Sequence, residues 1–270
     1  MSPEGGSAAA TRAARRGRAR RAYDLLGELV RSDILIRYGR GRIRVVKWLL
    51  DPIAALGVYL LLVALVLDRG DEATGLSLVC AIVPFQLVVT SVINSFQAVS
   101  LRASIILNMS FPRGLIPVSA VVTESVVLTA SLTLIPLMMV IYAVAPTAAI
   151  LWLPVAFAVT VIFSIALAYP ATLFGIWYPE LLPFGVSLVR ALFFIAPGLI
   201  ALDQLSGTAR DLLPFNPLTG LFETFRDALL YGQAPAAWQL LVPLGFAVVI
   251  LAISYPIYRS EQTQFAKLIG

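Results

Sequence analysis

The chain has 270 residues, of which 59% are hydrophobic and only 13% are charged, and its formal net charge is +5. A soluble domain averages about 45–50% apolar and about 25% charged residues, so this composition excludes an ordinary soluble protein. One cysteine, Cys80, excludes a disulfide framework within the chain, and the lack of histidine excludes a histidine-based metal site or general base. The hydrophobic residues lie in long blocks, which predicts an all-α polytopic membrane protein.

The N-terminal region carries most of the positive charge. Residues 1–21 are rich in Ala, Arg, Gly and Ser without apolar periodicity, which predicts a disordered basic cytoplasmic tail. Residues 22–47 place apolar side chains at helical spacing, which predicts an amphipathic helix on the membrane surface, with an ordinary lead-in to the first span as the alternative. Its end carries a basic cluster suited to anionic lipid headgroups, formed by Arg37, Arg40, Arg42, Arg44 and Lys47.

Six apolar segments follow, each with roughly the 20 residues that cross a hydrocarbon layer about 30 Å thick. We expect them at Trp48–Leu67, Leu76–Val99, Leu115–Val144, Ile150–Phe174, Phe184–Leu202 and Trp238–Tyr258. Together they form a transmembrane domain over residues 48–258, followed by a tail at 259–270. The placement of Lys and Arg predicts that both termini and the connector between the second and third spans are cytoplasmic.

That connector is a short island, Ile105–Pro117, which contains one arginine, two prolines and one glycine between two apolar runs. A segment this compact is either a plain connector or a contact with another protein. The spacing of the residues leaves both interpretations open.

A half-apolar stretch at 203–237 separates the fifth and sixth spans, and its pieces are too short and too charged to cross a membrane. Asn216 precedes Pro217 and should therefore be extended, so that Thr219 caps a helix at 220–231 with Glu223 near its positive end. The pattern predicts paired re-entrant helices over about 203–232, with a plain extracellular loop as the alternative.

The sequence contains no catalytic constellation, so the chain is expected to move or anchor something. Glu124 is the one clear acid within a span, where a carboxylate costs about 2.5–3.5 kcal/mol and must face protein or water. Three interpretations of Glu124 stay open. They are a structural ion pair with Arg190, a pore-facing or gating role, and snorkelling to the membrane interface. Six residues near the predicted outer end are candidates for lining a carbohydrate path, although lipid-facing packing suits each of the aromatic ones equally well. They are Phe193, Phe194, Phe215, Asn216, Phe222 and Phe225.

Several short motifs, in their order and spacing, resemble those of ABC-2-type permeases of the polysaccharide, O-antigen and teichoic-acid export family. The motifs are Ser32–Tyr38, Trp48–Pro52, Ile82–Phe85, Phe111–Ser119, Phe193–Pro197 and Asn216–Arg226. The resemblance covers about residues 23–266 and implies a non-enzymatic permease that binds no cofactor. It also implies a channel formed by two copies, and two copies of a separate ATP-binding subunit that holds ATP and magnesium. The cargo implied is a lipid-linked glycan moved outward across a bacterial plasma (inner) membrane.

The resemblance further implies a coupling helix at about 102–114 that contacts the ATP-binding subunit. The chain departs from the family pattern at Asp51, at Gly114 and at Leu107–Met109. The last two departures leave the island less charged than usual. Docking should therefore depend on apolar contacts, with Arg113 as the main charge. The other residues assigned to this contact are Ile105, Ile106, Met109, Phe111 and Pro112.

The Ala- and Arg-rich composition fits a high-GC bacterium such as an actinobacterium. In such a bacterium, a lipid-linked galactan of the cell wall would be a natural cargo for a permease of this family. Two further functions stay open. One is a drug or lipid efflux permease of the same superfamily, and the other is a membrane-integral enzyme or scaffold of envelope assembly.

Overall fold

The computed structural model describes residues 20–36, 39, 74–103, 111–198, 201–262 and 265, with a few single positions between 50 and 61. Every regular element in these residues is a helix, which confirms the all-α prediction. After an N-terminal helix at 20–36, the α-helices are α3 (Thr74–Leu101), α5 (Leu115–Ser131), α6 (Leu134–Ile141), α7 (Leu153–Trp177), α8 (Leu182–Ile195), α9 (Thr208–Leu212), α10 (Pro217–Arg226) and α11 (Ala237–Glu261). Short 3₁₀ helices occur at Ala148–Trp152, Pro179–Leu181, Leu202–Gln204 and Leu213–Phe215, and a π-helical turn at Asp227–Tyr231.

Within the described residues, four helical segments are long and apolar enough to cross a membrane. They are Gly75–Leu101, Leu115–Ile141, Ala148–Trp177 and Ala237–Glu261. These match the predicted second, third, fourth and sixth spans, so the chain is a multi-pass membrane protein. The predicted first span lies largely outside the described residues.

The predicted fifth span is shorter than expected. Helix α8 has 14 residues, which at a rise of 1.5 Å per residue is about 21 Å and less than the roughly 30 Å of a hydrocarbon layer. Pro197 disfavours helical backbone at the residue before it, and Ala196 is extended with ψ 150°. The prediction that this helix continues to Leu202 is therefore wrong.

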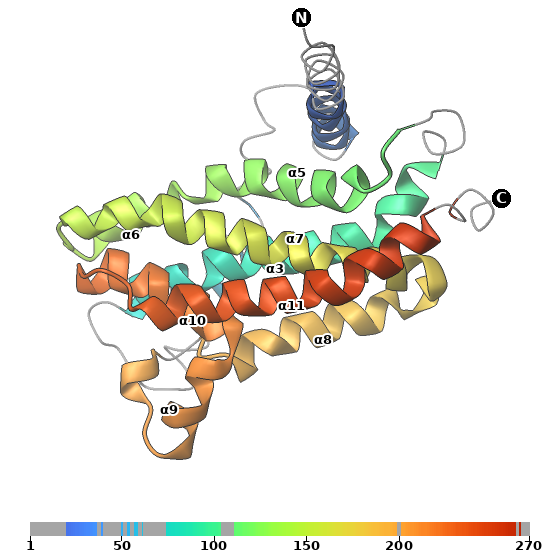
Figure 1. The fold of residues 1–270 in the computed structure, drawn as a ribbon. Helices are drawn as coiled ribbons and strands as arrows, with labels where there is room; N and C mark the ends of the chain where they lie inside the picture. The colour runs from blue at the N-terminus through green and yellow to red at the C-terminus, as the bar shows by residue number, and fades with distance from the viewer. Residues whose placement is uncertain are drawn as a thin grey trace, which may run out of the picture.

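The long helices lie side by side in Figure 1, and the N-terminal helix lies above α5 in this view. Helix α3 is central and packs against α5, α7, α8 and α10, while α11 packs against α7 and α10. Helices α3 and α7 lie very close together at Gly175, where an added Cβ would lie 1.7 Å from the Phe96 carbonyl oxygen.

Figure 1 also shows that the bundle has two distinct ends. The island end contains the C-terminal ends of α3 and α11 and the start of α5. The junction end contains α6, α9, α10 and the start of α11.

Candidate functional site: the two ends of the bundle

Arg226 organises the junction end, and it is completely buried at the end of α10. Its Nη1 donates to the Glu223 carboxylate at 2.6 Å and to the Pro197 carbonyl at 2.9 Å. Its Nη2 donates to the Gly198 carbonyl at 3.0 Å and its Nε to the Ser77 hydroxyl at 3.1 Å. A buried guanidinium is tolerated only where a carboxylate and other acceptors replace its water. These contacts, the Arg226 network, join α10 to α3 and to the segment after α8.

Two acids extend this arrangement to the neighbouring segments. Glu223 Oε1 also accepts a hydrogen bond from the Leu202 amide at 3.1 Å. Asp227 is buried as well, and its two oxygens accept from Gln233 at 2.8 Å and from Gln239 at 2.7 Å. The end of α10 is therefore tied to the segment after α8 by one acid and to the start of α11 by the other.

The cap of α10 differs from the prediction. Asn216 is extended, as expected before proline, but its own side chain accepts the hydrogen bond from the Leu218 amide at 3.0 Å. Pro217 is the first helical residue, a position where its fixed φ and missing N–H suit a helix start. Thr219 is therefore not the cap, and Glu223 pairs with Arg226 instead of lying at the helix N-terminus.

Sequence reasoning missed the role of Arg226, which it treated only as a charge of the half-apolar stretch. A signal was present, because Glu223 and Arg226 lie three residues apart in a segment whose other residues are mostly apolar. Such a pair lies on one helix face, and burial of that face requires both charges to be buried together.

The predicted path-lining aromatics divide into two groups. Phe193, Phe222 and Phe225 are at most 1% exposed. The Phe193 ring lies 4.8 Å from the Phe85 ring and 5.8 Å from the Phe222 ring, measured between centroids. All three pack against other hydrophobic side chains of this chain. The other two predicted aromatics are exposed: Phe194 and Phe215.

Glu124, on α5, is buried and faces protein. Its Oε1 accepts a hydrogen bond from Asn94, on α3, at 2.6 Å. Arg190 is exposed on α8, so Asn94 rather than Arg190 contacts the carboxylate. This placement satisfies the requirement that a carboxylate within a membrane helix faces protein or water.

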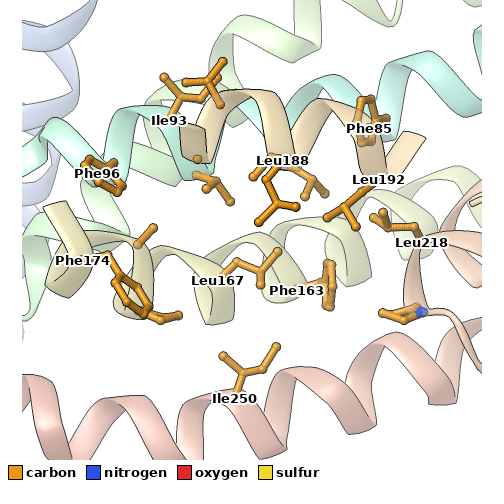
Figure 2. Close-up of a pocket in the computed structure, with 18 of the residues that line it drawn as sticks. Phe85, Ile93, Phe96, Phe163, Leu167, Phe174, Leu188, Leu192, Leu218 and Ile250 are labelled. Carbon is orange, nitrogen blue, oxygen red and sulfur yellow. The ribbon is translucent and has the colours of Figure 1, made fainter. Parts of the chain in front are cut away.

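A cavity of about 580 Å³ lies between α3, α7, α8 and α11. Figure 2 shows Phe85, Phe163, Leu188, Leu192 and Ile250 arranged around it. Asn216 is the one residue with a hydrogen-bonding side chain among those described as lining it. Because sugars need hydrogen-bond partners, this cavity suits hydrocarbon rather than glycan.

The island end is organised around the main chain of the island. The Tyr258 hydroxyl, on α11, donates to the Arg113 carbonyl at 2.8 Å, and the Tyr169 hydroxyl, on α7, donates to the Gly114 carbonyl at 3.2 Å. The two tyrosine rings meet edge to face with centroids 5.1 Å apart. Phe111 packs against this cluster.

The same contact continues into the C-terminal segment. The Arg113 guanidinium donates to the Gln262 carbonyl, at the C-cap of α11. Phe265 is fully buried, and its ring lies edge to face with Tyr258 at a centroid distance of 5.4 Å. Arg113 thus contacts its own chain, where a cation also suits the negative end of a helix.

The N-terminal helix is attached at this end too. Its Leu29 and Val30 are buried. Its Asp33 forms an ion pair with Arg102, just after α3, and accepts a hydrogen bond from the Thr123 hydroxyl, on α5, at 3.3 Å. One carboxylate thus joins three separate segments.

The other predicted contact residues are only partly described. Pro112 is exposed, whereas Ile105, Ile106 and Met109 lie outside the described residues. The basic cluster from Arg37 to Lys47 lies outside them as well.

In the part of the chain that the structure describes, no group of three or more Asp, Glu, Cys or His side chains could hold a metal ion. The polar side chains at the two ends instead bind main-chain groups and one another. These polar contacts are suited to fixing the helices relative to one another.

Sequence comparison finds relatives of this chain among proteins described as export permeases. An O-antigen export system permease protein, RfbA, of Myxococcus xanthus is 27% identical over 248 residues, which cover 91% of this chain and 95% of that protein. Two proteins of the same description from Klebsiella pneumoniae are each 22% identical over 249 residues, or 92% of this chain and 95% of theirs. The chain is related to O-antigen export permeases. This confirms the resemblance to the ABC-2-type glycan-export permeases, although no protein-family model matches the chain.

Proposed function

We propose that the chain is the membrane permease subunit of an ATP-driven ABC exporter of a lipid-linked polysaccharide. The observation that carries the proposal is the similarity to O-antigen export permeases over about nine-tenths of the chain. An O-antigen, teichoic-acid or galactan type of glycan is moved from the cytoplasm to the exterior of a bacterium. The protein resides in the inner membrane with both termini cytoplasmic.

The proposed assembly contains two copies of this chain and two copies of an ATP-binding subunit that holds ATP and magnesium. The described cavity supports a two-copy channel indirectly. Its apolar lining cannot replace the water around a sugar, which favours a glycan path outside this cavity, such as one between two copies.

In the proposed mechanism, ATP binding closes the partner subunits beneath the island. The island passes this motion to α3 and α5, the helices that flank it. The segments from α9 to α10 form the re-entrant pair and gate the exit at the other end.

The direct test is depletion of the chain followed by localisation of the lipid-linked glycan. We expect glycan to accumulate where a lectin or antibody reaches it only after the cells are permeabilised, and re-expression of the chain to restore surface labelling. In a parallel experiment, cells that carry a partner subunit unable to hydrolyse ATP should accumulate glycan in the same way. Surface delivery that continues at the normal rate in depleted cells would rule out this function.

The cavity favours a second candidate, an efflux permease for drugs or small lipids. A space of about 580 Å³ lined almost entirely by apolar side chains is suited to such a ligand. This function predicts that depletion increases sensitivity to apolar compounds while glycan delivery continues.

The orientation has its own test. A reporter fused after Gly270 should report a cytoplasmic location. A periplasmic signal there would contradict the proposed topology.

A further inference from the structure

The island and the residue that follows α3 before it are attached to the two terminal parts of the chain. Arg102, before the island, is paired with Asp33 of the N-terminal helix. Arg113, within it, contacts Tyr258 and Gln262 at the end of α11. These contacts bridge 69, 145 and 149 positions in sequence, so chain connectivity does not impose them.

The attachment to α11 is reciprocal. Tyr258 donates to the island's main chain, while Arg113 donates to the Gln262 carbonyl at the helix end, where carbonyls have no intrahelical partner. Loop carbonyls normally bind water, but here two successive ones, at Arg113 and Gly114, each accept from a tyrosine hydroxyl. Tyr258 is only 1% exposed, so its ring is held by packing and its hydroxyl has a fixed position.

The attachment to the N-terminal helix is ionic. The Asp33 side chain is 15% exposed and the Arg102 side chain 6% exposed. The pair is thus largely shielded from water, and the Thr123 hydroxyl restricts the carboxylate further.

We infer that Asp33 and Tyr258 are positioning residues through which motion of the island is passed to the N-terminal helix and to α11, as well as to α3 and α5. The inference rests on the proposed function, in which an ATP-binding subunit moves the island. If these contacts break, the partner still hydrolyses ATP, but the island moves without the rest of the bundle. The two contacts therefore set how much glycan is exported per ATP hydrolysed.

The test uses Tyr258→Phe and Asp33→Asn in the full-length chain, assembled with its ATP-binding subunit. Tyr258→Phe removes the hydroxyl and keeps the ring, and Asp33→Asn removes the charge and keeps the shape. Export per ATP hydrolysed should fall about fivefold in Tyr258→Phe, the effect of losing one buried hydrogen bond of ordinary strength. It should fall further in Asp33→Asn, which leaves Arg102 without its counter-ion. The amount of complex and its ATPase activity should be retained.

Matched controls are available on the same helices. Tyr255→Phe alters an exposed tyrosine three residues before Tyr258, and Asp24→Asn alters an exposed aspartate of the N-terminal helix. Both controls should keep the wild-type ratio of export to hydrolysis. Asp33→Glu should restore most of the ratio lost in Asp33→Asn, because it restores the charge.

Hydrogen exchange provides a readout that does not depend on export. In the purified complex without nucleotide, the amides of residues 111–116 should exchange faster in Tyr258→Phe than in the wild type, and at the wild-type rate in Tyr255→Phe. Unchanged exchange in Tyr258→Phe would overturn the attachment itself. Faster exchange with an unchanged export-to-hydrolysis ratio would show a merely structural contact and overturn the positioning role.

The two proposals fail differently. If the wild-type complex exports no glycan, the proposed function is wrong, while the exchange arm still reports on the attachment. If export and hydrolysis fall together in proportion to the amount of complex, the contacts serve folding only, and the positioning role is wrong while the proposed function stands.

Discussion

The junction end and the island end hold their polar groups in different ways. At the junction end, Arg226 and Glu223 are paired inside the protein, at 0% and 7% side-chain exposure. At the island end, neutral tyrosine hydroxyls bind loop carbonyls, and the Asp33–Arg102 pair keeps some contact with water. Removing one partner of a buried ion pair costs about 3–5 kcal/mol, whereas an ordinary hydrogen bond contributes about 0.5–1.5 kcal/mol.

This difference separates a region that must stay assembled from one that can rearrange. Breaking the Arg226 network would leave a buried charge without compensation, so its parts should move as one unit. The tyrosine–carbonyl contacts of the island end involve no charge, so each can be lost singly without leaving a buried charge. The comparison predicts that substitutions at the junction end change stability and that substitutions at the island end change coupling.

The largest effect is expected from Arg226→Met, which leaves Glu223 buried without its cation. We expect a loss of about 3–5 kcal/mol in the free energy of unfolding. The measurement is thermal or denaturant unfolding of the detergent-solubilised protein, together with its amount in the membrane.

Two further variants sharpen this prediction. Arg210→Met removes an exposed arginine on α9 and should leave stability unchanged. The double variant Arg226→Met with Glu223→Leu should recover much of the loss, since it removes the uncompensated charge. If Arg226→Met were as stable as the wild type, the rigid-junction interpretation would be wrong.

The sequence predicts much of this fold because long apolar segments and helix breakers are local features. Four predicted spans appear close to their expected bounds, and Asn216 is extended before Pro217, as expected. The end of α8 could also have been placed at Ile195, because Ala196 precedes a proline. The prediction that the helix continues to Leu202 relied on hydrophobicity instead of on this local rule.

The site was less predictable because its contacts depend on which helix faces meet. Arg113 was expected to be the main charge of a docking surface, yet its guanidinium contacts Gln262, 149 positions away. Glu124 was assigned Arg190 as a possible partner, but Asn94 contacts it. Hydropathy and charge patterns locate spans along the chain, but they do not specify the rotation of one helix against another.

Gly175→Ala tests the packing beneath the island end. The added Cβ would lie 1.7 Å from the Phe96 carbonyl oxygen, and backbone cannot move aside as a flexible side chain can. We expect a loss of about 1–3 kcal/mol in the free energy of unfolding through separation of α3 and α7. Gly245→Ala in α11 is the control, because its Cβ would meet nothing within 4 Å. Equal stability of both variants would show that the two helices separate at little cost.

Phe111→Ala and Arg113→Ala compare apolar and charged contacts at the island. We expect Phe111→Ala to uncouple ATP hydrolysis from export more strongly, because the island carries little charge with which to bind a partner. Arg113→Ala should mainly loosen the end of α11, where its guanidinium contacts Gln262. The measurement is ATPase activity and export on the same preparations. A greater uncoupling in Arg113→Ala would mean that charge dominates docking.

The smallest effect on stability is expected from Glu124→Gln, in the α5 segment between the two ends. The substituted amide keeps an oxygen that can accept the hydrogen bond from Asn94, so the free energy of unfolding should change by at most about 1 kcal/mol. The substitution removes the negative charge of Glu124. Glu223 and Asp227 at the junction end are also buried acids. A larger loss of stability would show that this carboxylate, like Glu223, depends on charge for its place in the fold. Reduced export at normal stability would instead assign it to gating, whereas unchanged export and complex assembly would contradict any functional role.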